Sequence, residues 1–233
     1  MVSGRSAKRD RARRELVTGR RGPSTALVIA VVVVLLFAGA VGFAVYRAQH
    51  GSDDVVIPAG GSPTGIIVGQ ASAPATIDVY LDFQCPVCKA YEEQTGSTID
   101  QLVAAGQAKV VYHPVAYLDR FSSTQYSTRS SQSSACAADA GVFPAYLKLL
   151  FAEQPPENSA GLSDDQLVAL GRQAGAGDAF ASCVADERYA GWTKSVTDAA
   201  SRSGVNGTPT VLVNGTAVDR TPDALLAAVQ GAG

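Results

Sequence analysis

Hydrophobic residues are distributed in three different ways along this chain. Residues 25–46 form a run of 22 residues without charge, dominated by Val, Leu, Ala, Ile and Phe. Residues 75–81 instead alternate Ile, Val and Leu with Thr, Asp and Tyr, which predicts a strand with one buried face. From 122 to 203, scattered apolar positions lie among Ala, Ser, Asp and Gln, and this pattern predicts several helices.

The remaining predicted elements are shorter. Strands are expected at 66–68 and 109–115, and Asn214-Gly215 between two β-prone segments predicts a hairpin. A helix is expected at 89–103, and a last one begins at Pro222, because Pro is favoured in the first turn of a helix. Together these elements predict an α/β domain over 63–233 with a helical insertion at about 119–203.

The uncharged run predicts a transmembrane helix over 25–46. Its 22 residues would span about 33 Å as a helix, enough for the hydrocarbon core of a bilayer. The segment 1–24 contains eight Lys and Arg residues against two Asp and Glu residues, so this basic tail is expected in the cytoplasm and the C-terminal part outside it. Residues 47–62 offer little to bury and are expected to be a flexible linker. The alternative is a cleaved signal peptide, because Ala38-Gly39-Ala40 is a triplet of small residues.

Charge excludes one class of function. Without the basic tail, the chain retains 11 basic and 19 acidic residues, so the predicted domain is acidic. Nucleic-acid binding needs a basic stripe, and this composition does not supply one.

All four cysteines follow the uncharged run, so they are expected in an oxidising compartment. Cys136 and Cys183 have no close cysteine neighbour, and we therefore predict that they form a structural disulfide with each other. A second redox pair is the alternative for these two residues.

Cys85 and Cys88 lie where the strand at 75–81 gives way to the next helix. Two thiols at this spacing can close a small ring and reopen it, which suits electron exchange. The free N–H groups and the dipole at a helix start favour a thiolate at Cys85. Half of a zinc site and a plain structural disulfide are the alternatives. Together with His113 the pair would still be one ligand short of a closed tetrahedral site, so no metal or other cofactor is expected.

Two separated segments resemble the signatures of a known family. These are Asp82-Phe83-Gln84-Cys85-Pro86-Val87-Cys88-Lys89 and Gly204-Val205-Asn206-Gly207-Thr208-Pro209-Thr210, which look like the two motifs of the DsbA-like members of the thioredoxin superfamily. The resemblance covers roughly 63–231 and implies a thioredoxin-like fold with a four- or five-stranded sheet, helices on both faces and a helical cap. It also implies that the peptide bond before Pro209 is cis and faces the cysteine pair.

The resemblance implies roles for the residues of both motifs. Cys85 would be the exposed thiol that bonds to a client protein, and Cys88 the buried thiol that closes the ring. The backbone of Thr208 would receive the client chain like an added strand. The expected client-binding residues are Pro86, Val87, Thr208 and Pro209.

Three acidic or apolar positions near the pair leave questions open. Strongly oxidising members of the family often have His where this chain has Val87, so the oxidising power is not fixed by the resemblance. Asp82 is expected either to accept a proton from Cys88 or to be a solvated carboxylate. Glu92, in the following helix, is expected on a solvated face.

These features predict a membrane-tethered thiol–disulfide oxidoreductase that introduces disulfide bonds into exported proteins. The family implies two partners: reduced exported client proteins, and a quinone-linked membrane protein of the DsbB or vitamin K epoxide reductase-like type that reoxidises the pair. A reductase or isomerase would use the same cysteines in another direction. A metallochaperone or binding module would use the fold without turnover.

Overall fold

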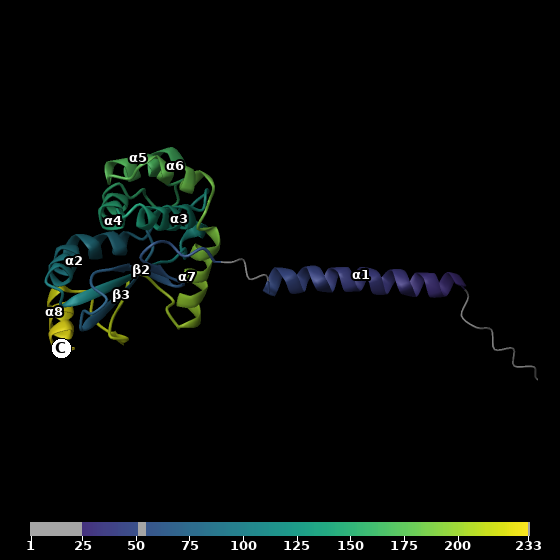
Figure 1. Cartoon of the computed structure of the whole chain (residues 1–233), viewed down its shortest axis with the longest axis horizontal. Coiled ribbons are helices and arrows are strands. Elements are labelled where there is room, and N and C mark those ends of the chain that lie inside the picture. The colour runs from purple at the N-terminus through teal and green to yellow at the C-terminus, as the bar shows by residue number, and fades with distance from the viewer. Residues whose placement is uncertain (1–24, 51–54, 233) are drawn as a thin grey trace, which may run out of the picture. The chain divides into compact units, whose positions relative to one another are not determined.

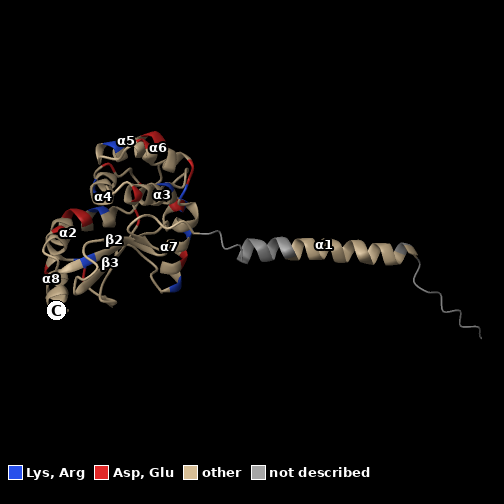
Figure 2. Ribbon diagram, viewed as in Figure 1, with Lys and Arg blue, Asp and Glu red and all other residues tan. Residues whose placement is uncertain are grey.

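The computed structural model describes residues 25–50 and 55–232, and the chain divides into two compact units, 1–52 and 53–233. The predicted basic tail, 1–24, lies outside the described residues, as do residues 51–54 of the predicted linker. The first unit contains helix α1 (Thr25–His50), whose described side chains carry no charge (Figure 2). Its apolar side chains are exposed, Leu36 by 69% and Phe37 by 71%. Within the part of the chain that the structure describes, no helix is both long enough and apolar enough to cross a membrane.

The second unit is built on a six-stranded sheet in the order β1-β2-β4-β3-β5-β6. The central strands β3 (Ala75–Leu81) and β4 (Ala108–Pro114) are parallel. The outer pairings are antiparallel: β2 (Gly65–Val68) with β4, and β5 (Thr210–Val213) with β3. Two edge strands of two residues each, β1 (Gly61–Ser62) and β6 (Thr216–Ala217), raise the strand number above the four or five expected.

The alternation of β3 explains its central place. Ile77, Val79 and Leu81 are at most 3% exposed, whereas the residues between them are half-buried. In the register of the sheet, Val79 lies opposite Tyr112 of β4 and Val211 of β5, and both of these side chains are buried too. One face of the three central strands therefore forms a continuous apolar core.

Helices cover the sheet on both sides. α2 (Pro86–Ala104) and α8 (Pro222–Gln230) contact each other on one side, and α7 (Ala190–Arg202) packs against β4 on the other (Figure 1). The helices inserted between β4 and α7 gather at one end of the unit, and they are the 3₁₀ helix η1 (Asp119–Phe121), α3 (Tyr126–Asp139), α4 (Phe143–Ala152), α5 (Asp164–Gln173) and α6 (Asp178–Ala185). Although α7 falls within the range predicted as insertion, it contacts the sheet directly.

Helix α3 is buried despite a polar sequence. Five of its serines are fully buried, and their hydroxyls donate to nearby carbonyl or carboxylate oxygens, as Ser130 does to Tyr126 O (2.7 Å) and Ser131 to Pro114 O (2.7 Å). Because these side chains are small and satisfied, α4, α6 and α7 all pack directly against α3. A disulfide between Cys136 of α3 and Cys183 of α6 joins two of these helices covalently.

Candidate active site

Cys85 lies in the short connection between the end of β3 and the start of α2. It is the N-cap residue of α2, with extended backbone angles (φ −78°, ψ 116°), and its N–H donates to Asp82 O at 2.9 Å. Its carbonyl accepts from Cys88 N (3.0 Å) and Lys89 N (3.2 Å), which starts the helix. Both thiols are free, and Cys85 is 6% exposed against 1% for Cys88. The expectation that Cys85 is an exposed thiol is therefore wrong, although Cys85 is the more accessible of the two.

The surroundings at the start of α2 give the two thiols different pKa values. A hydrogen bond from the Cys88 thiol lowers the pKa of Cys85 to about 6, and the Cys88 and Val87 N–H groups act in the same direction, against the opposing effect of burial. Burial is the largest cause that raises the pKa of Cys88, and the neighbouring Cys85 raises it further. At neutral pH the reduced pair thus holds its negative charge on Cys85 and its proton on Cys88.

The second motif lies directly against Cys85. The Thr208–Pro209 peptide bond is cis, as the resemblance implies, and Cys85 Sγ lies 3.5 Å from Thr208 O, to which Cys85 donates when its thiol is protonated. Thr208 is half-buried and Pro209 is buried at the start of β5. Residues 123 positions apart are thereby brought together at one end of the sheet.

A groove of about 410 Å³ opens over this junction. Its floor includes Cys85, Pro86, Val87 and Thr208, and the Val87 side chain is 52% exposed there. The groove is also lined by Asn206 of the second motif and by residues that the sequence did not single out, which are Tyr117, Leu118, Arg120, Glu157 and Ser201. No local pattern marks these five residues, because three separate segments contribute them.

Asp82 is fully buried below the cysteine turn, so the prediction of a solvated carboxylate is wrong. Its Oδ1 accepts from Gln84 N (2.9 Å) and Ser127 Oγ (2.7 Å), and its Oδ2 accepts from Leu118 N (2.9 Å). Burial raises the pKa of Asp82 to about 6 in spite of these three donors. The carboxylate ties the cysteine turn to the loop before η1 and to α3, and its donors in the described residues are these three groups rather than Cys88.

His113, which was considered and rejected as a third metal ligand on sequence grounds, lies away from the cysteine pair in its own set of contacts. His113 Nε2 lies 3.0 Å from Asp78 Oδ1, its Nδ1 lies 2.6 Å from Thr64 O, and its ring stacks on Tyr80. Across the described residues, no group of three or more His, Cys, Asp and Glu side chains could hold a metal ion.

Comparisons with known proteins identify relatives for the second unit. A family model described as thioredoxin matches residues 61–231. The serine/threonine-protein kinase PknE of Mycobacterium tuberculosis is 35% identical over an alignment of 158 residues, and the match covers 63% of this chain and 28% of the kinase. The chain thus matches little more than a quarter of that curated relative.

Two solved structures from Mycobacterium tuberculosis resemble the unit over most of their length. Reduced DsbA is 28% identical, with a TM-score of 0.65, over 72% of this chain and 91% of that protein. The reduced disulfide bond oxidoreductase DsbG is 32% identical, with a TM-score of 0.62, over 70% of this chain and 82% of that protein.

Proposed function

Since the chain belongs to the thioredoxin family and is a DsbA-like thiol–disulfide oxidoreductase, we propose that it introduces disulfide bonds into exported proteins through Cys85 and Cys88. The observation that carries this proposal is the asymmetry of the two thiols. Cys85 is the acidic thiol at the start of α2 and lines the groove, whereas Cys88 is buried and keeps its proton. An acidic Cys85 stabilises the reduced form of the pair, and that makes its disulfide a good oxidant.

The proposed reaction runs in two exchange steps. A client thiolate attacks Cys85 Sγ of the Cys85–Cys88 disulfide, so that a client–Cys85 bond forms and Cys88 leaves as a thiolate and takes up a proton. A second client thiolate then attacks the client sulfur of this mixed disulfide and releases Cys85 as a thiolate. The client loses two electrons and gains a disulfide, and the cysteine pair is reduced.

We assign client binding to the groove. Pro86, Val87 and Thr208 line the groove together with Cys85, and the half-buried Thr208, which precedes Pro209, places its backbone beside Cys85. In the proposed complex, an extended client segment lies along Thr208 and exposes its cysteine to Cys85.

We also propose that the enzyme is tethered to the cell membrane, with its N-terminus in the cytoplasm. The support is the uncharged run at 25–46 and the excess of basic residues before it. A quinone-linked membrane protein of the DsbB or vitamin K epoxide reductase-like type would then reoxidise the pair. In cells stripped of their wall, external protease should digest 63–233 and spare the tail; a soluble exported protein that begins near Ala40 would instead identify a cleaved signal.

Substitution of each cysteine tests the proposed roles. Cys85→Ser should abolish oxidation of a reduced client, because it removes the sulfur that the client attacks. Cys88→Ser cannot form the Cys85–Cys88 disulfide, so it should not oxidise a reduced client. Its Cys85 thiolate should instead attack the disulfide of an oxidised client, release one client thiolate and accumulate client–Cys85 adducts that reductant releases, because Cys88 is absent to resolve them. Full oxidase activity in Cys85→Ser, with no adducts in Cys88→Ser, would refute the assignment, and a bound metal ion lost from both variants would favour a metallochaperone.

A further inference from the structure

Gln154 reaches the cysteine turn from the inserted helices. It lies in the loop after α4, is half-buried, and its Nε2 donates to Phe83 O at 2.8 Å and to Cys85 O at 3.0 Å. One amide group thus bridges two carbonyls of the turn that carries the reactive sulfur, from a position 69 residues further along the chain.

The end of α4 holds the same turn by two other contacts. The Phe151 ring packs on the Phe83 ring with centroids 5.2 Å apart, and Phe83 is only 1% exposed. Lys89 Nζ, in the first turns of α2, donates to Ala152 O at 3.2 Å. The bridge from Gln154 therefore belongs to a packed junction between α4 and the start of α2, and is not an isolated surface contact.

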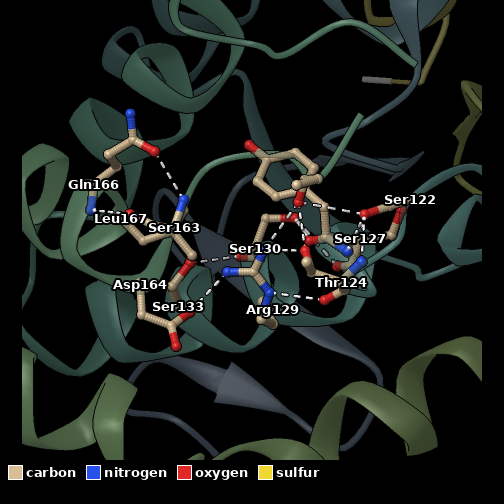
Figure 3. Close-up of polar contacts among 12 residues, drawn as sticks. Ser122, Thr124, Ser127, Arg129, Ser130, Ser133, Ser163, Asp164, Gln166 and Leu167 are labelled. Carbon is tan, nitrogen blue, oxygen red and sulfur yellow. Dashed lines mark hydrogen bonds and ion pairs between the residues drawn. The ribbon is translucent and has the colours of Figure 1, made fainter. Parts of the chain in front are cut away.

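The loop that carries Gln154 is fixed at its far end by Arg129 of α3. The guanidinium donates to Asp164 Oδ1 (2.8 Å), Thr124 O (2.9 Å), Thr124 Oγ1 (2.6 Å) and Ala160 O (3.3 Å) (Figure 3). Gly161 follows with a positive φ of 73°, and a Cβ at this position would lie 2.4 Å from Tyr126 Cγ. These contacts hold the loop against α3, and a residue that positions a reactive group needs such a rigid attachment.

We propose that Gln154 is a positioning residue that sets the direction of Cys85 Sγ toward the client. The proposal rests on the proposed function, since disulfide exchange needs the attacking and leaving sulfurs aligned on Cys85. Among the described residues, the Gln154 amide is the donor that satisfies the Phe83 carbonyl, so its loss would free the turn to rotate. Rotation of the turn would also move Cys85 relative to the Cys88 and Val87 N–H groups, which favour its thiolate.

Three variants of the full chain test this role. Gln154→Ala should lower the rate constant for oxidation of a reduced dithiol peptide about tenfold, because small misplacements of reacting groups are costly. It should also raise the pKa of Cys85, followed by thiolate absorbance in a pH titration. Gln154→Glu has nearly the same shape but places a carboxylate against two carbonyls, so it should raise this pKa further. Gln166→Ala is the matched control, because it removes an exposed glutamine whose Oε1 accepts from Ser163 N in the α5 cap, away from the groove.

The outcomes separate positioning from general stability. Parent-like rate and Cys85 pKa in Gln154→Ala would overturn the proposal, and so would an equal loss of rate in Gln166→Ala at the same loss of melting temperature. Should Gln154→Ala fail to fold, an unchanged Cys85 pKa in Gln154→Glu would overturn it as well. If the parent oxidises no peptide, the proposed function fails, whereas the pKa comparison still tests positioning.

Discussion

Ionisation of the buried Asp82 opposes folding, and the size of this effect can be worked out from the structure. Burial raises the pKa of Asp82 from an ordinary 3.8 to about 6. Each pKa unit corresponds to about 1.4 kcal/mol, so ionisation destabilises the folded state by about 3 kcal/mol at neutral pH. The folded state holds this proton more tightly than the unfolded chain does. The stability that the protonated carboxyl provides is therefore fully present below about pH 4 and is lost as the pH rises through about 6.

Asp82→Asn removes the ionisable carboxyl group, but it also lowers the stability of the fold by an amount that does not depend on pH. The new amide group cannot accept from both Gln84 N and Leu118 N, so one buried donor loses its partner. That loss is worth about 1–3 kcal/mol at any pH. The variant should therefore be clearly less stable than the parent near pH 4 and about as stable, or more so, near pH 7.

Urea unfolding of the reduced proteins, followed by Trp192 fluorescence from about pH 4 to 7, measures both effects. The parent-minus-variant difference in unfolding free energy should fall by about 2–3 kcal/mol over this range, since contributions of other groups largely cancel. Ser127→Ala removes a donor that lowers the pKa of Asp82, so it should make the loss of stability with pH larger than in the parent. A parent-minus-variant difference that does not change with pH would refute the reasoning.

Three further predictions address the disulfide, the helix start and the loop. Replacement of both Cys136 and Cys183 by Ala should lower the free energy of unfolding by about 4 kcal/mol in the loop-entropy model, yet leave peptide oxidation within about twofold of the parent. Lost activity at unchanged stability would instead show that this pair takes part in electron transfer. Val87→His should lower the pKa of Cys85, because a cation near the start of α2 stabilises the thiolate, and an unchanged thiolate titration would contradict this. Gly161→Ala should destabilise the fold by more than about 1 kcal/mol in urea unfolding, because its Cβ would meet the Tyr126 ring at a positive φ; a neutral result would contradict that contact.

Sequence patterns predict the elements that carry the cysteine pair. The alternation over 75–81 corresponds to β3, and the strand-to-helix transition places Cys85 at the N-cap of α2. These features are local, so periodicity and spacing are sufficient to find them. The link between Cys85 and Thr208 was available only through the family resemblance, because nothing local brings residues 123 positions apart together.

Sequence patterns did not predict which polar residues are buried. The serines of α3 are polar and no sequence pattern predicts their burial, yet they are buried, because each hydroxyl donates to a carbonyl or carboxylate oxygen and the small side chains allow neighbouring helices to pack closely. Glu92 was likewise expected in solvent, but it is half-buried over Gly96, and burial raises its pKa to about 7. Tertiary packing decides such positions, and amino-acid composition does not record it.

The equilibrium of the Cys85–Cys88 pair with glutathione tests the central claim most directly. An acidic Cys85 stabilises the reduced form, so we predict a reduction potential above about −200 mV, on the oxidising side of thioredoxin at about −270 mV. A potential at or below that of thioredoxin would make the pair a reductant and contradict a role in introducing disulfide bonds.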